Sequence, residues 1–151
     1  MENNGLVSGA RGLLAALEQR LMQSNEISQR YGLALTPAQA RALITAERQT
    51  LRDCGRLEFG EGILPRLIYT FCDSPFISRG DYAQTLEALE DLFYTFKNEL
   101  NDALSDDELL EAMRMIFHGR AQGSLEYLEN MDTNRLFSAL RSDGENEDDD
   151  D

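Results

Sequence analysis

The residues of this chain that are best suited to chemistry lie together in segment 54–75. The segment holds both cysteines, two of the three prolines, three glycines within eight residues, and the carboxylates of Glu58 and Glu61 on either side of Phe59. Side chains of these types support four kinds of site: a phosphate loop, a metal centre, a reactive thiol or a carboxylate that works with a partner. Each kind needs further residues at a defined spacing.

A phosphate loop is the first possibility, because Gly60-Glu61-Gly62 precedes an expected helix and helix N-termini bind anions. Glu61, however, places a negative charge where the anion would sit. The usual phosphate-loop patterns, G-x-G-x-x-G and G-x-x-x-x-G-K-[ST], do not occur in the sequence. The glycines therefore indicate a tight turn.

A zinc site would have to use Cys54, Cys72 and His118, because the chain has one histidine. These residues lie 18 and 46 positions apart, without the C-x-x-C pair that zinc sites commonly use. A single histidine also excludes the two Glu-x-x-His pairs of a di-iron helical bundle. We therefore expect no metal and no cofactor.

A reactive thiol would combine Cys72 with His118 as base and Asp73 as acid. Cys72 ends an expected helix, where the negative end of the helix dipole disfavours a thiolate. His118 also ends a helix, so the dipole favours its imidazolium and predicts a capping role. We expect both cysteines to be buried free thiols and assign no catalytic residue.

Glu58 is the carboxylate that the sequence places between apolar neighbours, Leu57 and Phe59. A buried carboxylate needs a partner, and Arg56 or Arg66 is near in sequence. The favoured hypothesis is a structural ion pair that fixes the glycine-rich connector.

In the alternative hypothesis, the connector lines a small-ligand pocket over Tyr69 or Tyr94. The pocket would form where residues 56–62 and 73–76 face a long helix. Its candidate ligand-binding residues are Arg56, Glu58, Asp73, Lys97 and Glu99.

Capping boxes mark two of the helices that must position these residues. Thr36-Pro37-Ala38-Gln39 has proline at the first helical position, and Ser105-Asp106-Asp107-Glu108 adds acids that complement the helix dipole. Ser78-Arg79-Gly80-Asp81 is a weaker third start. Gly55 supplies a left-handed stop, and Gly119 ends the second capped helix. The residues that follow the first box at helical spacing are Ala40, Leu43, Ile44, Glu47 and Leu51.

The longest regular element is predicted over about 81–103. Apolar residues step by four and three along it, which is heptad spacing. These residues are Tyr82, Leu86, Leu89, Phe93, Phe96 and Leu100. The stripe suits either the central helix of a bundle or a dimer seam, and its aromatic residues favour the bundle.

Further helices are expected over about 8–30 and 64–71, and over 121–131 and 133–141. Alternating strand patterns are nearly absent. The sequence therefore predicts an all-α fold: a single-domain bundle of six or seven helices, residues 1–141, around the long central helix at about 81–103.

Half of the net charge of −14 lies in residues 143–151, which contain seven acids and no base. Such a run repels itself and buries no apolar surface, so we expect 142–151 to form a disordered acidic tail. The remaining chain is also acidic, which disfavours direct binding to nucleic acid because phosphates would be repelled.

The sequence also bears on location. No apolar run approaches the ~20 residues that span a bilayer, and the N-terminus lacks the basic start of a secretory signal. A secreted disulfide scaffold usually carries more than two cysteines. We expect a cytoplasmic protein that does not bind membranes.

Six short strings within residues 20–140 carry a family resemblance. They are Tyr31-Gly32-Leu33, Gly55-Arg56-Leu57-Glu58-Phe59-Gly60, Phe71-Cys72-Asp73-Ser74-Pro75, Phe96-Lys97-Asn98-Glu99, Ser105-Asp106-Asp107-Glu108-Leu109 and Gly123-Ser124-Leu125-Glu126. Together they resemble a small bacterial family that is catalogued as a domain of unknown function. The resemblance implies a free-standing cytoplasmic helical protein of this length, and it transfers no activity, ligand or catalytic residue.

These observations favour a protein without enzymatic activity that acts through interaction or as a scaffold. It would work as a homodimer or as a small subunit with a protein partner. One alternative is a ligand-binding or enzymatic helical bundle that uses the five pocket residues. The other is an acidic mimic of nucleic acid that binds a basic partner.

Overall fold

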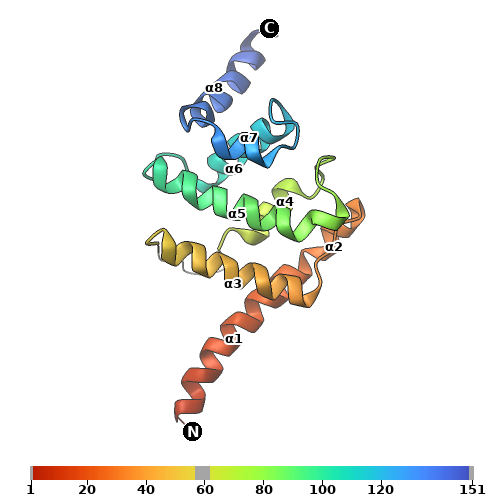
Figure 1. Ribbon diagram of the computed structural model, residues 1–151, viewed down its shortest axis with the longest axis vertical. Helices are drawn as coiled ribbons and strands as arrows, with labels where there is room; N and C mark the ends of the chain where they lie inside the picture. The colour runs from red at the N-terminus through yellow and green to blue at the C-terminus, as the bar shows by residue number, and fades with distance from the viewer. Residues whose placement is uncertain (1, 57–61, 150–151) are drawn as a thin grey trace.

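Helices form all the regular structure of the residues that the computed structural model describes, which are 2–56 and 62–149, with side chains described for 12–56 and 62–141. Seven of these helices have six residues or more, in agreement with the predicted all-α bundle. In chain order the helices are α1 (Glu2–Gln23), α2 (Asn25–Ser28), α3 (Pro37–Asp53), α4 (Leu64–Phe71), α5 (Tyr82–Glu99), α6 (Asp106–His118), α7 (Leu125–Asn130) and α8 (Asn134–Asp149), with 3-10 turns at Gln29–Tyr31 and Arg79–Asp81 (Figure 1).

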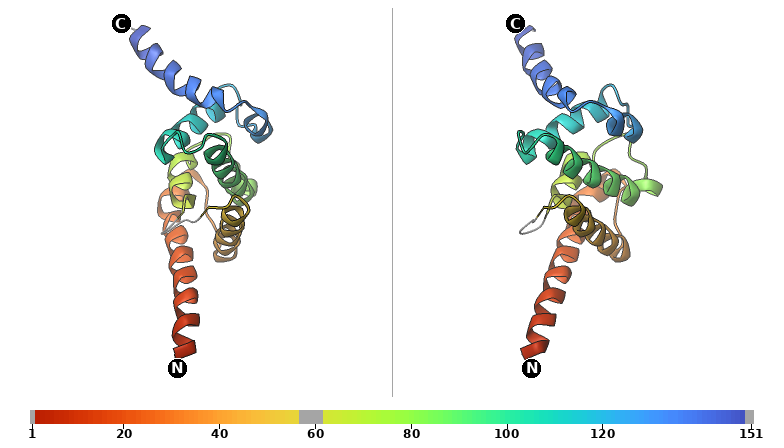
Figure 2. Two further views of the ribbon diagram at one scale, coloured as in Figure 1. Left: turned by 90° about the vertical axis from the view of Figure 1, so that its left-hand side faces the viewer. Right: turned by 60° about the vertical axis from the view of Figure 1, so that its left-hand side comes forward.

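Helix α5 is the central element of the bundle, as its sequence pattern predicts. It contacts α3, α4, α6 and α7 and crosses the middle of the molecule (Figure 1). The N-terminal part of α1 and the C-terminal part of α8 project from this body in opposite directions (Figure 2). Much of α1 therefore has no neighbouring helix to cover it.

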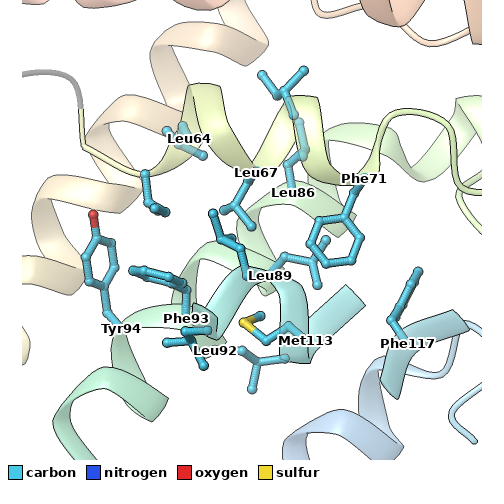
Figure 3. Packing of buried hydrophobic residues seen from close by; sticks show 14 of the residues in the cluster. Leu64, Leu67, Phe71, Leu86, Leu89, Leu92, Phe93, Tyr94, Met113 and Phe117 are labelled. Atoms are coloured by element: carbon cyan, nitrogen blue, oxygen red, sulfur yellow. The ribbon is translucent and has the colours of Figure 1, made fainter. Parts of the chain in front are cut away.

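The buried face of α5 decides between bundle core and dimer seam. All six residues of its heptad stripe are buried within the single chain. They pack against α4 and α6, where the rings of Phe71 and Phe117 meet edge to face at 5.5 Å between centroids (Figure 3). Burying a side chain of this size stabilises the fold by about 1.5–3 kcal/mol. The stripe therefore forms part of the core of the monomer and is not exposed for a dimer contact.

Both predicted capping boxes are present. The Thr36 hydroxyl accepts from the Gln39 amide N–H at 3.1 Å, and the Gln39 side chain accepts from the Thr36 N–H at 2.9 Å. Ser105 and Glu108 form the same reciprocal pair at 3.1 and 2.9 Å. Gly55 ends α3 with a φ of +69°, the left-handed conformation expected there.

Two helix boundaries differ from the prediction. The first helix runs from Glu2 to Gln23 rather than over 8–30, because the Asn25 side chain binds the backbone of Leu35 through both its oxygen and its nitrogen, at 2.8 and 2.9 Å. Helix α5 ends at Glu99 rather than near 103, because Asn101 and Asp102 adopt φ values of +53° and +60°. Both differences arise from side-chain and turn contacts that helical spacing does not encode.

The third predicted start and the closing helices also differ in detail. Ser78 donates to the Asp81 carboxylate at 3.1 Å, but residues Arg79–Asp81 form a 3-10 turn before α5 begins at Tyr82. Helix α8 runs to Asp149, into the acidic segment for which we predict disorder. That disorder, and the division of the chain at residue 141, stay predictions. None of the described helices is long and apolar enough to cross a bilayer.

Candidate functional site

The pocket residues predicted from the sequence do not gather in one place. Arg56 and Lys97 converge on the carboxylate of Asp102, whereas Asp73 pairs with Arg114 of α6. Glu99 is exposed at the end of α5, and Glu58 lies outside the described residues. Tyr69 is exposed on α4 and Tyr94 is buried. A ligand site made by all five residues stays a prediction.

Lys97 is buried, and its ammonium group has three acceptors. It donates to the Leu104 carbonyl oxygen and to Asp106 Oδ1, both at 2.9 Å, and lies 3.6 Å from Asp102 Oδ1. Arg56 Nη2 reaches the same Asp102 oxygen at 2.6 Å. Lys97 thus holds together the turn between α5 and α6, where the backbone takes its positive φ values.

The Arg56 guanidinium also binds the side chain of Asn98, at 2.7 Å, and the Asn98 amide donates to the Cys54 carbonyl oxygen at 2.9 Å. These bonds join the end of α3 to the end of α5. The hydrogen bond from Arg56, followed by its charge and that of Lys97, holds the pKa of Asp102 below its usual value. The contacts of Arg56 and Lys97 are those of a structural ion network.

Asp73 forms a second ion pair. Its two carboxylate oxygens accept from Arg114 at 2.9 and 3.2 Å, and Arg114 also donates to the Thr70 carbonyl oxygen. The bonded guanidinium lowers the pKa of Asp73. Burial followed by the Asp73 charge raises the pKa of the neighbouring Cys72 thiol. Cys54 and Cys72 are free thiols as expected, although Cys54 is only half-buried.

The capping role predicted for an imidazolium at His118 is wrong. His118 lies against the rings of Phe71, Phe76 and Phe117, and stacks on Phe76 with centroids 6.0 Å apart. Burial, together with the positive charge of Arg114, lowers the pKa of His118, and Nε2 has no hydrogen-bond partner among the described residues. Burial among the aromatic rings therefore lowers the pKa of His118 by more than the helix dipole raises it.

A buried carboxyl pair that the sequence analysis did not single out lies between α3 and α5. Its first member is Glu47, whose Oε2 accepts from the Ile63 backbone N–H at 2.9 Å and from the Tyr94 hydroxyl at 3.1 Å. Gly62, with a φ of +73°, passes so close that a Cβ atom there would overlap the carboxyl group. The glycine in the connector therefore makes room for the Glu47 carboxylate.

Glu90 of α5 is the second member of the pair. It is 1% exposed, its Oε2 lies 3.5 Å from the Thr50 hydroxyl, and its Oε1 has no hydrogen-bond partner among the described residues. Burial, followed by the negative charges of Glu47 and Asp91, raises the pKa of Glu90 to about 8. At neutral pH Glu90 therefore carries a proton. A carboxyl group whose pKa is raised by burial and by a neighbouring acid is a feature that acid–base sites use.

Glu90 lies beside an open groove of about 450 Å³ between α3 and α5. Glu90 and Thr50 line it together with small and polar side chains. The lining residues are Ala46, Gln49, Thr50, Gln84, Glu87, Ala88, Glu90 and Asp91. The signal for this site was present in the sequence, because Glu47 occupies a position of the apolar stripe of α3 and Glu90 follows Leu89 of the α5 stripe.

A metal centre is not apparent at this groove. Within the part of the chain that the structure describes, no three side chains of Cys, His, Asp or Glu are placed to hold a metal ion together. The arrangement can therefore do two things chemically. It can hold and release one proton at Glu90, and it can attract a positively charged group into the groove.

Glu90→Gln should remove a pH-dependent loss of stability. The raised pKa means that the folded state keeps a proton which the unfolded chain releases, so Glu90 destabilises the fold progressively as pH rises from about 4.5 to about 8. We expect the variant to be nearly as stable as the wild type at about pH 5 and about 3–5 kcal/mol more stable at about pH 9. Urea denaturation across this range measures the difference.

The control for this measurement is Glu87→Gln, which removes an exposed carboxylate from the same helix. Its difference from the wild type should stay small at every pH. A difference between Glu90→Gln and the wild type that does not change with pH would contradict the buried, protonated state of Glu90.

Lys97→Met tests the structural role of the ion network. It leaves the Leu104 carbonyl oxygen and Asp106 without their buried donor, so we expect a loss of about 2–3 kcal/mol in the free energy of unfolding. The control is Arg66→Met, which removes an exposed cation that pairs with Asp106 and Asp107 and should cost less than about 1 kcal/mol. Equal losses in the two variants would refute the structural role of Lys97.

The comparisons with known proteins agree with the sequence resemblance. A family model described as a family of unknown function, DUF6323, matches residues 20–146. No similar curated protein and no similar solved structure was found. The resemblance to an uncharacterised family, expected over residues 20–140, is thereby confirmed, and the chain belongs to DUF6323, a family of unknown function.

Proposed function

We propose that this protein acts through protein–protein contacts and that it associates with a second copy of itself through α1. The observation that carries the proposal is the exposure of two adjacent leucines on a helix that projects from the bundle. Leu13 and Leu14 are 48% and 43% exposed. Large apolar side chains left in water on an uncovered helix are typical of an interaction surface.

A groove beside these leucines offers a place for a partner side chain. It lies between α1 and α3, has a volume of about 320 Å³, and is lined by Leu14, Ala15, Glu18, Arg41, Ile44 and Thr45. Its charged residues, Glu18 and Arg41, neutralise each other in an ion pair at 3.3 Å. An apolar side chain can therefore enter without desolvating an unpaired charge.

The distribution of charge favours a second copy as the occupant. Helix α1 contains two acidic and two basic residues, whereas the whole chain carries −14. Two copies of so acidic a protein repel each other through most of their surface, and a neutral helix is where they can approach. A basic partner would instead be drawn to the acidic faces. We further propose a cytoplasmic location, which two free thiols support.

A second candidate function is the binding of a small ligand. It is favoured by the unpartnered oxygen of Glu90 beside the groove between α3 and α5. Arg56, Asp73, Lys97 and Glu99 do not line this groove. The contacts of Arg56, Asp73 and Lys97 support structural roles, and Glu99 is exposed, so a ligand site at Glu90 is the better form of this hypothesis.

Light scattering on the full-length protein tests self-association. We expect a species of about twice 17.1 kDa at micromolar concentration. The double variant Leu13→Glu and Leu14→Glu should be monomeric, because it places two charges in the apolar contact, and its circular dichroism should remain that of the wild type.

The matched control is Tyr69→Glu, which adds a charge at another exposed apolar residue, on α4. It should leave the dimer intact. A wild-type protein that stays monomeric up to about 0.1 mM would refute self-association. Loss of the dimer in the Tyr69→Glu variant would show that α1 is not the contact.

A further inference from the structure

We propose that the groove between α3 and α5 binds a short organic cation with primary ammonium groups, and that Glu90 is the residue that holds it. This site goes beyond the proposed self-association, because the groove lies on the α5 side of α3 and shares no lining residue with the groove beside α1.

The first reason is a buried polar atom beside the groove that has no partner in the described part of the chain. Glu90 is 99% buried as a residue, belongs to the lining, and leaves Oε1 without a hydrogen-bond partner among the described residues. A buried polar atom of this kind is costly and uncommon in a native fold. Oε1 is itself almost wholly buried, so an ammonium group in the groove supplies the missing partner once the Glu90 side chain turns toward it.

The second reason is the sign of the surrounding charge. None of the eight residues that line the groove is basic, and Glu87 and Asp91 are exposed acids at its rim. Glu47 approaches Glu90 from the α3 side, and the Cys54 thiol lies within electrostatic range of Glu90 and Asp91. The acids of α3 and α5 therefore attract a cation and repel an anion, whereas the Cys54 thiol, whose pKa is raised chiefly by burial, adds no charge.

The third reason is the shape and chemistry of the walls, which suit an organic cation better than a metal ion. Calcium and magnesium need several oxygen ligands at short, defined distances, and no such group of three acids exists among the described residues. An ammonium group accepts looser geometry and can donate to Glu90 and the Thr50 hydroxyl. Ala46 and Ala88 add small apolar walls that a methylene chain can contact.

Two acidic positions, one buried and one at the rim, point to a cation with two charges. A diamine with a short methylene chain would place one ammonium at Glu90 and the other between Glu87 and Asp91. Since Glu90 carries a proton in the empty protein, binding replaces this proton at Glu90 by one ammonium group of the diamine. The ammonium enters and the Glu90 proton leaves to the solvent, with no other change in covalent bonding.

Calorimetry with 1,4-diaminobutane tests the site. We expect one saturable site, and the dependence of the heat on the ionisation enthalpy of the buffer should show release of close to one proton near pH 7. Affinity should rise with pH from about 6 to about 8, because Glu90 gives up its proton more readily as pH rises.

Glu90→Gln should weaken binding about tenfold or more and abolish the proton release, because it removes the charge-assisted bond. The Glu90→Gln variant should keep the wild-type fold, since a neutral amide replaces a carboxyl group that is already neutral. The control is Glu99→Gln, an exposed acid on the same helix outside the groove, which should bind like the wild type. Glu87→Gln with Asp91→Asn should weaken the diamine more than it weakens 1-aminobutane.

Three results would overturn the proposal. The first is the lack of saturable binding at millimolar diamine, and the second is binding that Glu90→Gln leaves unchanged. The third is tighter binding of magnesium chloride or of the tripeptide Gly-Lys-Gly, which would assign the groove to a metal ion or to a lysine of a partner protein. None of these results bears on self-association, which the leucine variants of α1 test separately.

Discussion

The buried carboxylate of Glu47 is the constraint on which the arrangement of the bundle depends. It lies on α3, accepts from the backbone where α4 begins and from the Tyr94 hydroxyl on α5, and so joins three helices at one group. Burying a carboxylate costs several kcal/mol unless donors replace its water. The fold supplies these donors by bringing the chain at Ile63 against α3, which requires a glycine at residue 62 because a side chain there would overlap Glu47.

The chemistry at Glu90 follows from this constraint. A second carboxyl group on the facing helix must share the interior with a carboxylate that already has its donors, so Glu90 stays protonated and its Oε1 stays unpartnered. Replacing Glu90 by an apolar residue would relieve the repulsion. The presence of an acid where the core would be more stable without one is the kind of local conflict that marks functional sites.

The sequence predicted what depends on local contacts. Both capping boxes, the Gly55 stop and the buried stripe of α5 are correct because each is specified by residues within one or two turns of helix. Arg56 and Lys97 were both assigned to a ligand pocket, but in the structure they meet at Asp102, an acid that a turn of positive φ places between them. Asp73 pairs with Arg114, 41 residues away, and Tyr94 donates to Glu47, 47 residues away. The periodicity of a helix does not encode contacts over such separations.

Helix α3 borders both proposed surfaces, with Ile44 and Thr45 on the groove beside α1 and Ala46 and Thr50 on the groove beside Glu90. Its position is fixed by the Asn25–Leu35 hydrogen bonds just before its first residue, by Glu47 in the middle and by the Cys54–Asn98 hydrogen bond at the other end. A helix held at three points resists the shift that would pass a signal between its two faces. The proposed dimer through α1 and the proposed cation site at Glu90 therefore use opposite sides of one element, and each proposal can hold without the other.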